Sequence, residues 1–223
     1  MLQSPQSPAL ENGDRLTRFQ FEQRYHAMPP NNRKAELIEG VVYYMASPLR
    51  YDAHGLPHAM IMGWLWAYCA ATRGVDVADN ATLRLDMDNE PQPDALLRIE
   101  NGQSQISDDD YIEGAPELIV EVAASSASYD LHDKLNTYRR NGVQEYIVWQ
   151  IYNNELKWFS LREGKYVPLL PDEAGIIRSQ IFPGLHLAVH ALLARDKMSV
   201  MTTVQNGVKT SEHENFVKRL SQN

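Results

Sequence analysis

Two acidic residues in apolar surroundings are the best candidates for chemistry. Glu121 lies within the apolar segment ELIVEVA at 117–123, where a charged side chain is costly to bury unless it is paired, protonated or bound to a metal. Asp94 directly follows Pro93, at the start of a second apolar segment. If the two segments form neighbouring strands, both carboxylates meet at one end of a sheet. Such a pair suits Mg²⁺ or Mn²⁺, hard ions that prefer oxygen ligands and retain several waters.

Lys134 could bring an ammonium group to the same place. Asp130, Lys134 and Tyr138 are spaced i, i+4, i+8 on a helix predicted over 129–140, along the edge of its apolar stripe. A lysine beside a metal-bound water can lower the pKa of that water or hold a phosphate under attack. We therefore predict that the two carboxylates bind the metal and that Lys134 completes the catalytic set.

Each of these residues also has a purely structural interpretation. Glu121 could form a buried ion pair, with Lys134 itself as the partner. Asp94 could cap the proline-containing turn before its strand. Lys134 could pair with Asp130 on the surface of the helix, which stabilises a helix only weakly. The sequence leaves these alternatives open.

Composition narrows the class of protein. The chain has 223 residues, of which 43% are hydrophobic, enough for one domain with a substantial core. Its one cysteine, Cys69, excludes an intrachain disulfide and a zinc site built on cysteines, so we expect a reducing, cytoplasmic location. The start of the chain has no secretory signal pattern. The longest uncharged apolar stretch, 53–72, falls short of a membrane span, so we expect no membrane partner.

The net charge of −8 counts against a broad electrostatic surface for DNA, because affinity for phosphates comes largely from lysine and arginine. A local basic groove, or an acidic metal site that carries much of the negative charge, remains compatible with it.

The pattern of apolar residues predicts an α/β protein with one domain at 16–196, a disordered segment at 1–15 and a separate tail at 197–223 with a small helix near Phe216. Helices are predicted from a capping box at Thr17–Gln20 to a Pro-Pro-Asn-Asn terminator at 29–32, then at 57–73, 129–140 and 190–195. Strands are predicted at 35–45 (with a turn at Gly40), 82–87, 95–99, 117–123, 145–151 and 156–161. The strand–helix–strand order over 117–151 implies a right-handed crossover between parallel strands.

The same candidate residues belong to an ordered series of motifs. These are ELIEG at 36–40, PD at 93–94, PELIVEV at 116–122, Asp130, Lys134 and Tyr138 followed by GVQEY at 142–146, and FPGL at 182–185. Over about residues 15–195 the series resembles the Uma-type family of restriction-endonuclease-like proteins, within the PD-(D/E)XK nuclease superfamily. The resemblance implies a restriction-endonuclease-like core, with a central mixed β-sheet flanked by helices. It also implies a Mg²⁺-dependent phosphodiesterase site and often a homodimer.

The resemblance assigns roles residue by residue. Asp94 takes the position of the superfamily's first metal-binding aspartate, and Glu121 that of its second acidic ligand. Ala123 stands where the superfamily usually has a lysine, and the resemblance suggests that Lys134 supplies the ammonium from the following helix.

Three further residues are predicted to contact the substrate. Glu36 alternates with Ile38 on its strand and could reach the same pocket, although an exposed strand position would look the same. His58 lies at the predicted start of a helix, where similar proteins often carry a histidine; a capping or structural role is the alternative. Tyr138 shares the helix edge with Lys134.

The leading functional hypothesis is a Mg²⁺- or Mn²⁺-dependent endonuclease that hydrolyses phosphodiester bonds of DNA. The alternative is a catalytically inactive protein of the nuclease fold that serves as a nucleic-acid or protein interaction module, which Ala123 and the net charge favour. A hydrolase of small phosphate esters is a third possibility. No glycine-rich phosphate loop, serine nucleophile elbow or histidine metal motif is present to support an ATPase, an esterase or a zinc hydrolase.

Overall fold

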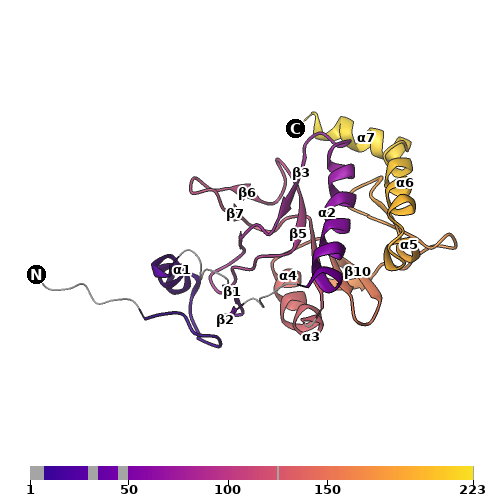
Figure 1. The fold of residues 1–223 in the computed structure, drawn as a ribbon. Helices are drawn as coiled ribbons and strands as arrows, with labels where there is room; N and C mark the ends of the chain where they lie inside the picture. Colours follow the sequence, from indigo (N-terminus) through magenta and orange to yellow (C-terminus); the bar gives the residue numbers. More distant parts are fainter. Residues whose placement is uncertain (1–7, 30–34, 45–49, 125, 223) are drawn as a thin grey trace, which may run out of the picture.

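The centre of the molecule is a mixed sheet of six strands in the order β11-β10-β9-β8-β5-β3 (Figure 1). The computed structural model describes residues 8–29, 35–44, 50–124 and 126–222. The strands are β3 (Val75–Asp79), β5 (Ala95–Ile99), β8 (Leu118–Ala123), β9 (Glu145–Gln150), β10 (Glu155–Arg162) and β11 (Lys165–Pro168). β8 and β9 are parallel, as the crossover predicts, and the other neighbours are antiparallel. The predicted α/β class with a mixed central sheet flanked by helices is confirmed.

β8 is buried along its whole length because side chains cover both of its faces. Leu118, Val120 and Val122 belong to the larger hydrophobic core, on the side of α2 (Leu56–Cys69). Ile119 and Ala123 belong to a second core on the opposite side. Side chains alternate along a strand, so Glu121 shares the second face with these two residues.

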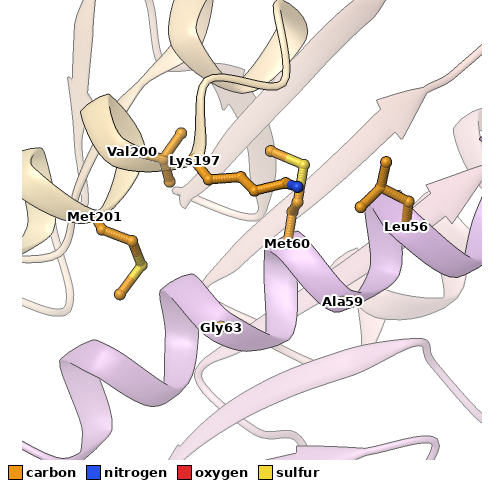
Figure 2. Close-up of a pocket in the computed structure, with 7 residues that line it drawn as sticks. All are labelled: Leu56, Ala59, Met60, Gly63, Lys197, Val200 and Met201. Carbon is orange, nitrogen blue, oxygen red and sulfur yellow. The ribbon is translucent and has the colours of Figure 1, made fainter.

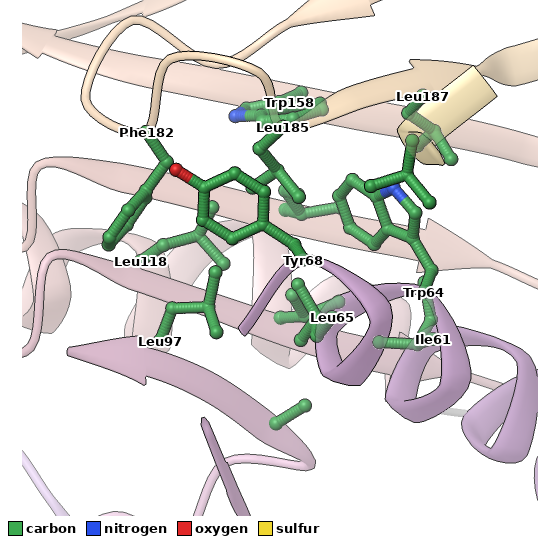
Figure 3. Close-up of a cluster of buried hydrophobic side chains, with 14 of the residues drawn as sticks. Ile61, Trp64, Leu65, Tyr68, Leu97, Leu118, Trp158, Phe182, Leu185 and Leu187 are labelled. Atoms are coloured by element: carbon green, nitrogen blue, oxygen red, sulfur yellow. The ribbon is translucent and has the colours of Figure 1, made fainter. Parts of the chain in front are cut away.

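The larger core joins α2 to the sheet. α2 lies alongside β3 and β5, with α6 and α7 beyond it (Figure 1). Ile61, Trp64, Leu65 and Tyr68 of α2 are fully buried against strand residues and the 182–187 segment (Figure 3). Their i, i+3, i+4, i+7 spacing is the predicted apolar stripe. α2 begins directly after a π-helical turn, η2 (Tyr51–Gly55), one element that sequence periodicity did not predict.

The C-terminal residues pack into this same core, where the sequence predicts a separate tail at 197–223; the small helix predicted near Phe216 is present. They form α6 (Lys197–Gly207) and α7 (Ser211–Leu220), and Val200, Val204 and Phe216 are buried in the larger core. The side chains of Asp196 and Thr210 cap the two helices. Apolar residues spaced four apart on a short helix are too few to identify a core face from sequence.

The second face of the sheet is covered by three short helical pieces where one helix was predicted over 129–140. They are α3 (Ala127–Tyr129), the π-helical turn η3 (Asp130–Lys134) and α4 (Leu135–Arg140). The π-helical turn changes the rotation between Asp130 and Lys134 relative to an α-helix, and both side chains are buried. Tyr138 of α4 packs against Tyr146 of β9, with ring centroids 5.0 Å apart.

A hairpin and a helix precede this core. The predicted capping box begins α1 (Arg18–Ala27), and β1 (Ala35–Ile38) pairs with β2 (Val41–Tyr44). The hairpin turns at Glu39 and Gly40, which both have positive φ. The predicted terminator at 30–32 and the strand end at Met45 lie outside the described residues.

Residues 8–15 are not the disordered segment that their composition predicts. Leu10 is buried, and the amide of Gly13 donates to the carbonyl of Val42 at 2.8 Å. Residues 1–7 lie outside the described part of the chain.

The remaining strands form small sheets. Of the predicted strand at 82–87 only β4 (Leu83–Arg84) forms, because Asp86 accepts hydrogen bonds from the amide of Asp88 and from Asn89 and so closes a turn. β4 pairs with β7 (Ile112–Glu113), which pairs with β6 (Gln105–Ile106). β12 (Ile176–Arg178) pairs with β13 (His186–Ala188), before α5 (Val189–Leu193).

Within the described ranges, no helix combines the length and apolar character required to cross a bilayer.

Candidate active site

Asp94 and Glu121 lie next to each other at neighbouring strands. β5 and β8 are antiparallel with Ala95 opposite Val120, so Asp94 lies across from Glu121. The amide of Val122 donates to Oδ2 of Asp94 at 2.6 Å. The register thus provides the close approach on which the sequence prediction depends.

Lys134 joins Glu121 to the N-terminal hairpin. Nζ of Lys134 lies 2.9 Å from Oε1 of Glu121 and 3.1 Å from Oε2 of Glu36. All three residues are at least 95% buried. Oε2 of Glu36 also accepts a hydrogen bond from the amide of Gln92 at 3.2 Å. The structure therefore brings together Glu36, Glu121 and Lys134, as predicted, and excludes an exposed position for Glu36.

A fourth carboxylate, Asp130, completes what we call the carboxylate cluster: Glu36, Glu121 and Asp130 around Lys134, with Asp94 beside Glu121. Asp130 is buried and accepts a hydrogen bond from Oγ of Ser126 at 2.6 Å. The sequence places Asp130 on the helix edge with Lys134 and in the series of family motifs, but assigns it no role at the site. The π-helical turn that buries Asp130 has no sequence signature that we recognise.

The electrostatics of the cluster keep Lys134 charged. Burial alone lowers the pKa of Lys134, but Glu121, Glu36 and Asp130 outweigh burial and raise the pKa above its usual value. Burial raises the pKa of Glu121, against the lowering effect of Lys134 and with Asp130, Asp94 and Glu36 adding to the rise. Burial likewise raises the pKa of Asp130 to about 6. One ammonium does not compensate the carboxylates around it, so the cluster retains a proton more readily than separate carboxylates would.

Tyr138 holds Glu121 from the inside of the fold. Its side chain is fully buried, and its hydroxyl donates to Oε1 of Glu121 at 2.9 Å. Burial raises the pKa of Tyr138 well above its usual value, and the nearby Glu121 adds to this. The ring is covered and the hydroxyl is engaged, so Tyr138 orients Glu121 in this structure, and its contact with substrate stays a prediction.

Two histidines lie against Asp94. Nε2 of His58 is 2.9 Å from the carbonyl oxygen of Asp94 and 3.2 Å from Oδ1 of Asp79. Nε2 of His54 is 3.5 Å from Oδ1 of Asp94, and the two imidazole rings stack with centroids 5.4 Å apart. Sequence reasoning selected His58 but missed His54. The i, i+4 spacing of the pair is the signal that could have identified it.

Tyr129 covers another side of the cluster. Its ring centroid lies 5.6 Å from Nζ of Lys134 and 4.5 Å from the ring of Tyr43. Its hydroxyl is buried and has no hydrogen-bond partner among the described residues. The aromatic pair therefore limits the access of water to the ammonium.

The clearest apolar groove is elsewhere. It has a volume of about 220 Å³ and lies between α2 and α6, where Leu56, Ala59, Met60 and Gly63 meet Lys197, Val200 and Met201 (Figure 2). A polar pocket of about 400 Å³ includes Arg18 and Arg84. No residue of the carboxylate cluster lines either cavity, so neither identifies the reactive centre.

The donors at the cluster fit a hard divalent ion. Carboxylate oxygens are the ligands that Mg²⁺ and Mn²⁺ prefer, and the excess of buried carboxylates over ammonium groups leaves negative charge for a cation to compensate. In the described parts of the chain, no three Asp, Glu, His or Cys side chains are already arranged to hold one ion. The arrangement therefore suits an ion that is bound by two carboxylates and completes its coordination with waters, as Mg²⁺ usually does.

Comparison with solved structures supports the fold. The crystal structure of a putative nuclease belonging to DUF820 from Anabaena variabilis aligns with a TM-score of 0.59 and 12% sequence identity. The alignment covers 77% of this chain and 96% of that chain. At this identity the similarity establishes the fold alone. A comparison with curated proteins gave no match.

Comparison with protein families is more specific. The profile of the Uma2 family, described as "putative restriction endonuclease", matches residues 22–190. This range includes the entire carboxylate cluster and both histidines, and it confirms the family resemblance that the ordered motifs indicate. The chain is a member of the Uma2 family of restriction-endonuclease-like proteins.

Proposed function

We propose that this protein is a Mg²⁺- or Mn²⁺-dependent endonuclease that hydrolyses phosphodiester bonds of DNA. The observation that carries the proposal is that Asp94 lies across from Glu121 and that the ammonium of Lys134 forms an ion pair with Glu121. Membership of a restriction-endonuclease-like family supports a nucleic-acid substrate. Metal binding, DNA as the substrate and the roles of individual residues are part of the proposal.

Asp94 and Glu121 would hold the metal. When bound, a divalent ion of this kind can acidify a water and stabilise charge on the phosphate under attack. Asp94 is suited to the role because the Val122 amide fixes one carboxylate oxygen. Glu121 is oriented by Lys134 and Tyr138, which both donate to its Oε1.

Lys134 acts as a cation in this scheme. Because the surrounding carboxylates raise its pKa, it does not lose a proton near neutral pH and is not the general base. Its charge stabilises the ionised form of Glu121 and the negative charge that develops on the phosphate. Glu36 holds the ammonium in place from β1.

The arrangement also addresses the missing lysine at Ala123. Ala123 is fully buried on the same strand face as Glu121, and the ammonium of Lys134 reaches Glu121 from η3 instead.

The test is cleavage of supercoiled plasmid and of single-stranded and duplex oligonucleotides with Mg²⁺ or Mn²⁺. Wild type should cut, whereas Asp94→Asn and Glu121→Gln should each lose at least about a hundredfold in rate. Asp76→Asn is the matched control, because Asp76 pairs with Arg98 on the exposed side of β3. Wild type that cuts no nucleic acid with either ion contradicts the proposal.

A second candidate is an inactive interaction module of the same fold. The observation in its favour is that Lys134 is already engaged by two carboxylates, Glu36 and Glu121. Calorimetry with Mg²⁺ and Mn²⁺ separates the two functions. A module binds nucleic acid or protein without binding metal, whereas the endonuclease loses metal binding in Glu121→Gln. Cleavage of small phosphate esters but not of DNA would instead indicate a phosphoesterase.

The proposal extends to assembly and location. We infer a homodimer, on the family resemblance, and light scattering of the purified chain tests it. The thiol of Cys69 donates to the carbonyl of Val75 at 3.0 Å, and a free thiol in this position supports a reducing compartment such as the cytoplasm.

A further inference from the structure

The two carboxylate oxygens of Asp94 have different surroundings. Oδ2 accepts the Val122 amide at 2.6 Å, which fixes the plane of the carboxylate against β8. Oδ1 lies 3.5 Å from Nε2 of His54. The oxygen that remains for a ligand therefore shares its immediate surroundings with an imidazole nitrogen, which is itself a metal ligand of a different chemical type.

The local fold positions the His54 ring. His54 is in the π-helical turn η2, where the amide of Gly55 donates to the carbonyl of Arg50 at 3.1 Å. Single π-helical turns are frequent at functional sites. The His54 ring stacks on His58 at an interplanar angle of 13°, and His58 is itself held by the carbonyl of Asp94. The stack fixes one face of the His54 ring.

His58 is a poorer candidate for a ligand. Its Nε2 already lies 2.9 Å from the Asp94 carbonyl oxygen and 3.2 Å from Oδ1 of Asp79. The contact that the structure gives for His54, by contrast, is to Oδ1 of Asp94, a proposed metal ligand. If an ion replaced the contact between His54 and Asp94, both side chains would bind that ion and neither would be left without a partner.

We propose that His54 is a metal ligand through Nε2, beside Oδ1 of Asp94, and that it gives the site a preference for Mn²⁺ over Mg²⁺. The inference rests on the proposed metal site. Adjacent ligands of an octahedral ion at about 2.1 Å lie about 3 Å apart, so the pair has to close by about half an ångström. Imidazole nitrogen binds first-row transition ions well and Mg²⁺ poorly, whereas carboxylates and waters accept both.

Calorimetry with MnCl₂ and MgCl₂ separates a ligand from a supporting hydrogen bond. Loss of a hydrogen bond that only orients Asp94 weakens both ions equally. Loss of a nitrogen ligand weakens Mn²⁺ selectively. We expect His54→Ala to raise the Kd for Mn²⁺ at least about tenfold and the Kd for Mg²⁺ less than about threefold. His190→Ala, at an exposed position of α5, should change neither Kd.

A second variant keeps the test independent of folding and of side-chain packing. His54→Gln retains an amide that can donate to Asp94 but is a weak metal ligand. It should restore the wild-type Kd for Mg²⁺ and not that for Mn²⁺. Pulsed electron paramagnetic resonance of the Mn²⁺-loaded protein should show a directly bound nitrogen in wild type and in His190→Ala, and none in either His54 variant.

Three results overturn the inference: wild type that binds no Mn²⁺, a Mn²⁺ spectrum without bound nitrogen, or equal losses for the two ions in His54→Ala. The endonuclease proposal fails separately. If bound nitrogen is present and depends on His54, but no nucleic acid is cut, His54 remains a ligand and the proposed reaction is wrong.

Discussion

Lys134 donates to Oε1 of Glu121 at 2.9 Å and lies 3.1 Å from Oε2 of Glu36, so one ammonium connects the central strand β8 to the hairpin strand β1. Both carboxylates and the lysine are almost completely buried. The proposed reactive centre is therefore also a structural link between the N-terminal hairpin and the sheet, and its variants affect activity and stability together.

Replacement of Lys134 tests the structural part of this link. Lys134→Met leaves Glu36 and Glu121 buried without their cation, which should lower the free energy of unfolding by about 3–5 kcal/mol. Urea denaturation at pH 7.5 measures the change. Lys218→Met is the control. Lys218 is exposed on α7, and its ion pair with Glu214 lies on the surface of that helix. An unchanged stability in Lys134→Met would show that the pair is not a buried link.

Tyr138 should act on Glu121 without contacting substrate. Tyr138→Phe removes the hydroxyl, and with it the 2.9 Å hydrogen bond to Glu121, but keeps the aromatic ring. It should lower the free energy of unfolding by about 1–3 kcal/mol. In the cleavage assay it should lower kcat and leave KM unchanged, because the side chain is fully buried. A change confined to KM would instead support the direct substrate contact predicted from sequence.

The pH dependence of stability should reflect three buried carboxyls. Burial raises the pKa of Glu90 to about 8, of Glu145 to about 7 and of Asp130 to about 6. Each folded-state pKa lies above the unfolded value, so the native state binds protons more tightly than the unfolded chain. Stability should therefore rise as the pH falls from about 8 to about 7, above the range in which His186 and His213, whose pKa values burial lowers, oppose the trend. Thermal unfolding from about pH 8.5 to 7 checks the sign, and a Tm that falls on acidification there would refute it.

Glu90→Gln isolates the upper part of that range. Oε2 of Glu90 is buried without a hydrogen-bond partner in the described chain, whereas Oε1 of the neighbouring Glu22 lies 2.8 Å from Nε of Arg84. A proton shared between the two carboxyls would satisfy Glu90. A Gln amide at position 90 can donate to Glu22 at every pH. The variant should flatten the Tm profile between about pH 7 and 8.5 and leave the lower range unchanged. A profile that keeps its slope there would assign the dependence to other groups.

Phe216 tests whether α7 is part of the domain. The ring is 5% exposed and contacts Phe182 edge-on, with centroids 6.3 Å apart. Phe216→Ala should lower the free energy of unfolding by about 3–5 kcal/mol. Met198→Ala, at an exposed position of α6, should be nearly neutral. If both variants are neutral, the C-terminal helices are a separate tail, as the pattern of apolar residues predicts.

The local pattern of residues was sufficient for four strands of the central sheet, β5, β8, β9 and β10, but it did not predict the two edge strands β3 and β11. β5 forms at 95–99 as predicted, and the strand–helix–strand order correctly predicts the parallel pairing of β8 with β9. Both follow from short-range properties: alternation or continuity of apolar side chains, and the handedness of a crossover. The same information fails for 197–223, because packing of a short amphipathic helix depends on a partner far away in the chain.

The sequence by itself determined which groups were available: two carboxylates in apolar segments, a lysine on the next helix and the motifs of a nuclease family. Only the tertiary structure decided which of them meet. The antiparallel register of β5 and β8 places Asp94 across from Glu121, and the β1 hairpin carries Glu36 to Lys134. Two π-helical turns present His54, Asp130 and Lys134 to the same centre. Strand register and helix rotation follow from the packing of the whole core, which no local stretch of sequence encodes.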